Sequence, residues 1–172
     1  MNGAILLIPL FLIRYGLLAL INKMALPRAA YFPPMQKTEK VMFYIYQIST
    51  ILILIYMFFL NITVTDIISK IGLGVYALGV VSFAAATVSF AKPSAGGINQ
   101  YRLYRLSRNP MYVAYFIYFL GCVLITRSIL LLILVCAFQI AAYWIILAEE
   151  RWCSQTFGDE YTKYMNKVRR YI

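Results

Sequence analysis

Long apolar runs restrict the fold of this chain more than any other feature. A helix needs about 20 mostly apolar residues to cross the hydrocarbon core of a bilayer. Five runs reach or approach that length, and they cover Ala4–Ile21, Val41–Leu60, Ile71–Ala91, Met111–Thr126 and Ile129–Ala148. Only 13% of the residues are charged, against about 25% in a soluble domain. The sequence therefore predicts an all-α integral membrane protein with about five transmembrane helices.

The last two runs are separated only by Thr126-Arg127-Ser128, which predicts an antiparallel helical hairpin. Because the fourth run is short, a hairpin that does not fully cross the bilayer is an alternative. After Phe157-Gly158, apolar and basic residues alternate at helical spacing, which predicts an amphipathic tail helix at the membrane surface. We expect three transmembrane helices in residues 1–91 and a C-terminal region in residues 92–172, joined in one structural domain.

The basic residues indicate how the chain lies in the membrane. The net charge is +10, from 16 Lys and Arg against 6 Asp and Glu. These cations cluster in the connections Lys23–Lys40 and Lys92–Asn109 and in the tail. That placement favours anionic lipid over nucleic acid as the partner. It predicts a multi-pass protein with its N-terminus outside and its C-terminus in the cytoplasm.

The sequence gives no support for a metal site or for histidine-dependent catalysis. The sequence contains no histidine, which is the usual zinc ligand and the usual general base at neutral pH. Its cysteines, Cys122, Cys136 and Cys153, have no spacing typical of a metal site or a disulfide framework. We therefore expect no metal and interpret the cysteines as apolar filling.

Two features inside the spans need a structural explanation. Arg14 lies midway along the first run, where a charge costs about 2.5–3.5 kcal/mol on insertion scales, so it must find a partner or reach water. Gly72, Gly74 and Gly79 in the third run are typical of close helix packing.

Polar residues gather at two places on the expected cytoplasmic surface. In Arg108-Asn109-Pro110-Met111-Tyr112, Asn109 is a favourable N-cap and Pro110 a favourable first helical residue. Helix N–H groups and Arg108 would then suit an anionic group, although a capped helix with ordinary topogenic charge explains the motif as well. Glu149-Glu150 ends the fifth run, where acids oppose the helix dipole. Either a cationic or hydroxyl-rich ligand or ion pairs with Arg151 and loop arginines would explain that pair.

Taken in order, these motifs resemble the isoprenylcysteine carboxyl methyltransferase and phospholipid N-methyltransferase superfamily. The resemblance covers about residues 97–172: the Arg108–Tyr112 stretch, the hairpin, Glu149-Glu150, and a tail with Phe157-Gly158, Tyr161 and Tyr164. It implies that S-adenosylmethionine binds at the cytoplasmic side, between the loop, the hairpin and the tail. The family also has a G-x-G motif, for which Gly96-Gly97 in the loop is better placed than Gly72-Leu73-Gly74.

The resemblance assigns roles by position. The cofactor-binding residues would be Gly97, Tyr104, Arg108, Asn109, Pro110, Tyr112, Glu149 and Glu150. Arg108 and Glu150 would act in catalysis, with Arg108 on the methionine carboxylate and Glu150 or Tyr112 receiving a proton from an amine acceptor. Substrate contacts would come from Tyr115, Tyr161, Tyr164 and Arg169.

The resemblance therefore implies a membrane methyltransferase that uses S-adenosylmethionine on a lipid or lipid-attached carboxyl or amine. The acceptor would enter laterally from the bilayer, past the aromatic side chains of Tyr112, Tyr115, Phe116 and Phe119. The alternative is that these side chains pack between helices or face lipid. A chain this small is more typical of prokaryotic members, which predicts the inner (plasma) membrane. Two alternatives are an NADPH-dependent reductase of the sterol-reductase type and a non-catalytic lipid-binding scaffold.

Overall fold

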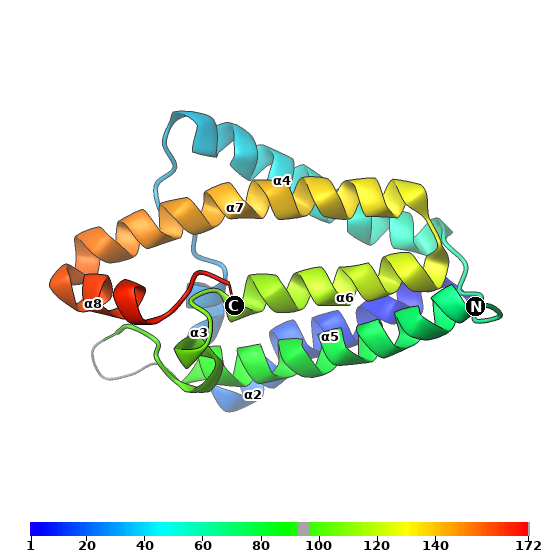
Figure 1. Cartoon of the computed structure of the whole chain (residues 1–172), viewed down its shortest axis with the longest axis horizontal. Coiled ribbons are helices and arrows are strands. Elements are labelled where there is room, and N and C mark those ends of the chain that lie inside the picture. The colour runs from blue at the N-terminus through cyan, green and yellow to red at the C-terminus, as the bar shows by residue number, and fades with distance from the viewer. Residues whose placement is uncertain (93–96, 172) are drawn as a thin grey trace.

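The computed structural model describes residues 1–92 and 97–171, and helices dominate this part of the chain (Figure 1). Gly96, named above, lies outside the described residues. The elements are η1 (Gly3–Leu7), α1 (Ile8–Phe11), η2 (Leu12–Leu17), α2 (Leu18–Ile21), α3 (Ala25–Ala29), α4 (Lys37–Tyr56), η3 (Met57–Phe59), α5 (Ile67–Ala91), η4 (Arg102–Arg105), α6 (Pro110–Thr126), α7 (Ile129–Phe157) and α8 (Asp159–Lys167).

Four helices are long and apolar enough to cross a membrane. They span Gly3–Ile21, Lys37–Phe59, Ile67–Ala91 and Ile129–Phe157, while the apolar helix Pro110–Thr126 is shorter. Their outward side chains are apolar and accessible, as at Leu20, Phe59 and Ile129, which are 87%, 75% and 76% exposed. Because so large an apolar surface is unstable in water, it faces lipid. The expected all-α, multi-pass membrane protein is confirmed.

Two helices, α4 and α5, begin before their apolar runs because polar residues cap them. α5 begins one turn before its apolar run because Asp66 accepts hydrogen bonds from the backbone N–H groups of Ile68 and Ser69, at 2.9 and 3.1 Å. α4 likewise begins at a capping box formed by Gln36 and Glu39. α7 has 29 residues and a length of about 43 Å, so it extends beyond a hydrocarbon core of about 30 Å.

α6 packs against α5 at backbone contact. A Cβ atom added to Gly79 of α5 would lie 2.5 Å from the Cα of Tyr118, and one added to Gly121 of α6 would lie 2.5 Å from the Cα of Tyr76. Gly72 meets α6 in the same way, whereas Gly74 has open space around it. Close packing thus explains Gly72 and Gly79, which leaves Gly72-Leu73-Gly74 with no visible role in a binding site.

α6 and α7 run antiparallel, as the short turn between them predicts (Figure 1). Each of them nevertheless packs most extensively on another partner, α6 on α5 and α7 on α4. An ion pair between Arg151 of α7 and Glu39 of α4 fastens the second of these pairs. Arg151 therefore does not pair with Glu149 or Glu150, which was one interpretation of the acidic pair.

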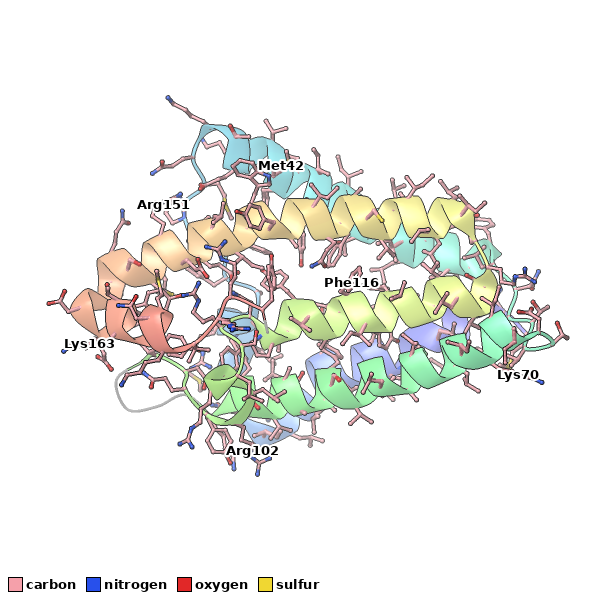
Figure 2. All side chains as sticks on the ribbon, viewed as in Figure 1. Met42, Lys70, Arg102, Phe116, Arg151 and Lys163 are labelled. Atoms are coloured by element: carbon pink, nitrogen blue, oxygen red, sulfur yellow. The ribbon has the colours of Figure 1, made fainter. Side chains whose placement is uncertain are left out.

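The two ends of the bundle differ in character. We call the end that holds α3, η4 and α8 the loop end. Figure 2 shows Arg102, Arg151 and Lys163 at this end, Lys70 at the opposite end and Phe116 between the two ends. The tail turns back after α8 toward the start of α6, where the backbone N–H of Arg108 donates to the carbonyl of Arg169 at 2.9 Å. Burial of Tyr161, Tyr164 and Val168 against Ile98 confirms the amphipathic pattern of α8.

Candidate active site

A cavity of about 680 Å³ lies at the loop end of the bundle, enclosed by the beginning of α6, the last part of α7 and α8. Its volume is in the range of small-molecule binding sites. It is lined by most of the residues that the sequence singled out: Gly97, Tyr104, Arg108, Asn109, Tyr112, Tyr115, Glu149, Glu150, Tyr161 and Tyr164. The loop, the hairpin and the tail therefore contribute to a single cavity.

Pro110 and Arg169 do not line this cavity. Pro110 begins α6 as predicted and is buried. Arg169 is exposed and contributes its backbone carbonyl, which accepts the N–H of Arg108. Asn109 stands at the N-cap position, but its amide nitrogen donates to the carbonyl of Arg170 at 3.2 Å and its side chain accepts no cap hydrogen bond. The expected N-cap side chain is thus used to hold the tail.

Glu150 is fixed between two guanidinium groups. Its carboxylate lies 2.9 Å from Nη2 of Arg108 and 2.7 Å from Nη2 of Arg170, and its side chain is only 8% exposed. Nε of Arg170 adds contacts of 3.2 Å to both carboxylate oxygens. Such charge-assisted, partly bidentate pairs are strong and rigid. Glu150 therefore joins the start of α6 to the tail, and its oxygens already have cationic partners.

Glu149 has a different environment, although it is the adjacent residue. Its carboxylate accepts a hydrogen bond from the hydroxyl of Tyr112 at 2.9 Å. In the described part of the chain, no Lys or Arg forms an ion pair with it. Since adjacent helical residues point about 100° apart, one carboxylate is held by arginines while the other lines the cavity beside a phenol.

Arg108 stands between the cavity and the tail and retains an unused donor. Its Nη1 donates to the carbonyl of Met165 at 3.1 Å, and Nη2 pairs with Glu150. Its Nε is buried and has no hydrogen-bond partner among the described residues. A buried donor without a partner is costly. Arg108 also lines the cavity, where a guanidinium suits an anionic oxygen.

Tyr104 and Tyr164 close the cavity as neutral hydrogen-bonding groups. The Tyr164 hydroxyl donates to the carbonyl of Tyr104 at 2.6 Å. Burial raises the pKa of Tyr164 to about 12. Exclusion of water also raises the pKa of Tyr104, with a further increase from Glu149, while Arg28 and Arg14 oppose the rise. Both phenols therefore stay protonated at neutral pH and position loops without transferring protons.

Aromatic rings form the deeper wall of the cavity. Tyr46 of α4 stacks on Phe138 of α7, with ring centroids 4.9 Å apart, and Tyr115 of α6 meets Phe83 of α5 at 4.7 Å. Both tyrosines line the cavity. The wall is thus apolar toward the middle of the bundle and polar at the loop end.

The cavity also contains residues that motif reasoning did not assign to it. Arg14, Arg28, Tyr46 and Trp152 all line it, and three of these precede the region of family resemblance. For Arg14 a signal existed, since a lone charge in an apolar run must be satisfied inside the protein. No comparable signal marks Tyr46 in a run rich in aromatic residues.

Comparison with known proteins agrees with the motif evidence. The family model described as phospholipid methyltransferase matches residues 47–160, which is more than half of the chain. No curated protein and no solved structure matches the chain. The match includes the cavity-lining residues of α6 and α7 but neither Arg14 nor α8 beyond Glu160. The chain therefore belongs to the phospholipid methyltransferase family, which makes it a membrane methyltransferase of the lipid-methylation kind.

Proposed function

We propose that this protein transfers a methyl group from S-adenosylmethionine to an amine nitrogen of a membrane phospholipid. The observation that carries this proposal is the unequal pair at the end of α7. Glu150 is held by Arg108 and Arg170, while Glu149 lies in the same cavity with only the Tyr112 hydroxyl as its hydrogen-bond donor. One acid is thereby structural, and the other remains able to bind a cation or accept a proton.

The cavity fits the cofactor by its chemistry. Arg108 lines the cavity, and its guanidinium suits the methionine carboxylate of the cofactor. Gly97 supports the same site because it has φ +83° and a Cβ there would lie 2.9 Å from the Phe157 ring. A side chain at this position would press on the cavity wall. Arg108, Gly97 and Tyr104 would thus hold the cofactor near α8.

The reaction is a displacement that positioning largely accomplishes. When bound, S-adenosylmethionine supplies a methyl group activated by its sulfonium. A new N–CH₃ bond forms while the S–CH₃ bond breaks, and the sulfur leaves as a neutral thioether. A head-group ammonium must lose one proton before its nitrogen can attack, and we assign the acceptance of that proton to the Glu149 carboxylate. Glu150, predicted above as catalytic, would instead position Arg108.

The same geometry favours an amine over a carboxylate as the acceptor. A carboxylate acceptor would have to approach the Glu149 carboxylate, which has no ion-pair partner among the described residues, and like charges at short range repel strongly where water is excluded. An ammonium group would be attracted to Glu149 before it loses its proton. The acceptor chains would lie toward Tyr46 and Tyr115, on the apolar side of the cavity.

Methyl transfer in lipid nanodiscs tests this proposal. Purified protein would be incubated with methyl-labelled S-adenosylmethionine in discs that contain dioleoylphosphatidylethanolamine or, as a control, dioleoylphosphatidylcholine. We expect label in the first lipid only, because the nitrogen of the second has no free electron pair. Calorimetry should show binding of S-adenosylhomocysteine and no binding of NADPH. Binding of NADPH alone, or the lack of any transfer by folded protein, would contradict the proposal.

A further inference from the structure

Arg14 interrupts the first transmembrane helix in both charge and backbone geometry. It lies within η2, a π-helical segment at Leu12–Leu17 inside the otherwise apolar span Gly3–Ile21. Short π-helical segments inside α-helices occur frequently at functional sites, and an arginine inside a span is costly unless the protein satisfies it. The side chain is partly buried and lines the cavity.

The contacts of Arg14 leave its charge without a counterion. One nitrogen donates to the backbone carbonyl of Ala29 in α3, and Nη1 lies 3.5 Å from the sulfur of Met111. Neither group carries a negative charge. The four ion pairs of the described residues join Arg108 and Arg170 to Glu150, Arg127 to Asp66, and Arg151 to Glu39. Arg14 takes part in none of them.

Arg28 strengthens the positive character of the same part of the cavity wall. Its guanidinium donates to the carbonyl of Phe90 at 2.8 Å and lies 4.9 Å from the centre of the Phe90 ring. It too lines the cavity and forms no ion pair with a described carboxylate. The cavity therefore has two cations without an ion-pair partner from the N-terminal part of the chain, the partly buried Arg14 and the exposed Arg28, and one available carboxylate, Glu149, from α7.

We propose that Arg14 binds the phosphate group of the lipid acceptor and thereby selects acceptors with an anionic phosphodiester. This inference rests on the proposed function. The head group of an amino phospholipid carries a phosphate and an ammonium, which match the arginine side and the Glu149 side of the cavity respectively. A guanidinium is well suited to phosphate because its planar fork forms paired hydrogen bonds.

The position of Arg14 along its helix agrees with this role. It lies seven residues before Ile21, where the span ends at the loop end, which corresponds to about 10 Å along the axis. A long arginine side chain can cover much of this depth by extending toward the interface. Its contact with Ala29 shows that it does extend toward α3 at the loop end. The guanidinium is thus near the level at which a lipid of that leaflet carries its phosphate.

Lipid binding by Arg14 variants tests the inference without relying on catalysis. Trp152 lines the cavity, so a Trp144→Phe background leaves it as the fluorescent reporter, and lipids brominated in their acyl chains would quench it. The variants are Arg14→Gln and Arg14→Lys, with Lys70→Gln at the opposite end of the bundle as the matched control. The probes are brominated dioleoylphosphatidylethanolamine and brominated dioleoylglycerol, which lacks the phosphate.

We expect Arg14→Gln to weaken binding of the phospholipid about 10- to 100-fold, because a charged hydrogen bond is lost. Binding of dioleoylglycerol should stay unchanged, Arg14→Lys should recover part of the affinity, and Lys70→Gln should behave as the parent. The affinity for S-adenosylhomocysteine, measured by calorimetry, should be the same in all variants.

Three results would overturn the inference. They are wild-type affinity for the phospholipid in Arg14→Gln, an equal loss for both lipids, and a loss confined to S-adenosylhomocysteine, which would place Arg14 at the cofactor. Arg14→Gln is expected to insert into the membrane, because removal of a charge from a span favours insertion. If this variant nevertheless does not fold, Arg14→Lys, which keeps the charge, takes its place in the comparison of the two lipids. Failure of the wild-type protein to bind S-adenosylhomocysteine would refute the proposed function alone, since the comparison of the two lipids still reports on Arg14.

Discussion

The two faces of α6 form very different interfaces. Toward α5, the helix makes backbone contact through Gly79 and Gly121, and the neighbouring Tyr76 and Tyr118 hydroxyls both bond to the carbonyl of Leu6. Toward α7, at the loop end, α6 presents Tyr112 and Tyr115 to the cavity. At the first interface, glycines let the two backbones touch, so no space remains between the helices. At the second interface, large polar rings line an open cavity.

This difference shows how a small membrane protein reconciles a stable bundle with a binding site. Without a hydrophobic driving force between helices in lipid, close van der Waals packing stabilises their association. The α5–α6 and α4–α7 pairs supply this packing, so the space between α6 and α7 is free to hold buried polar groups. The ion pairs of Glu150 then fasten the tail across the open end.

The largest change in stability should come from the cavity side, at Glu150. In Glu150→Ala, Arg108 would stay buried, with a side chain only 9% exposed and no carboxylate partner. We expect a loss of about 3–5 kcal/mol in unfolding free energy, measured by denaturant unfolding in detergent. The exposed Glu160→Ala in α8 is the control. Equal stability of the two variants would show that the ion pair does not hold the tail.

The packed side should respond next, at Gly79. A methyl group there meets the Tyr118 backbone, which cannot move aside cheaply. We expect Gly79→Ala to cost about 1–3 kcal/mol from overpacking, and the same unfolding measurement reports it. Gly74→Ala on the same helix has open space and should be neutral or slightly stabilising. If both alanines were neutral, the close contact of α5 and α6 would be refuted.

A smaller effect on stability should follow from removal of the Tyr112 hydroxyl. Tyr112→Phe deletes the donor to Glu149 and should cost about 0.5–1.5 kcal/mol. We also expect kcat to fall by less than about tenfold, because the carboxylate that takes the proton is retained. A loss of kcat as large as that of a Glu149 variant would instead identify Tyr112 as the proton acceptor.

The smallest effect should be that of Arg170→Gln. Its side chain is 30% exposed, and Glu150 keeps its contact with Arg108 when Arg170 is replaced. We expect a loss of about 0–1 kcal/mol in unfolding free energy, because Arg170 is partly solvated and its removal leaves no buried charge without a partner. A loss comparable to that of Glu150→Ala would show that the tail, and not Arg108, is the main partner of Glu150.

Much of the fold follows from the hydropathy of the chain. The five apolar helices, the short turn at Arg127 and the amphipathic tail were all predictable, since apolar runs and helical spacing are local properties. The packing of α4 against α7 was not predictable, because the Glu39–Arg151 ion pair that fastens it joins residues far apart along the chain. The π-helical segment around Arg14 also has no hydropathy signal.

The candidate site was predictable where family motifs mark it. Gly97, Arg108, Tyr112 and Glu149 line one cavity, as the order of motifs suggested. The unequal environments of Glu149 and Glu150 were not predictable, because they depend on where Arg108 and Arg170 lie in space. The contribution of α3 and of the first helix arises in the same way, from segments that carry no motif.

The most direct test of this account compares Glu149→Gln with the wild-type protein in the methyl-transfer assay. The substitution keeps the size of the side chain and removes its ability to accept a proton. We expect kcat to fall about 10²- to 10⁴-fold, while the affinity for S-adenosylhomocysteine changes little and the melting temperature is retained. Unchanged kcat in a folded variant that binds S-adenosylhomocysteine normally would contradict the assignment of Glu149 and, with it, the division of roles within the acidic pair.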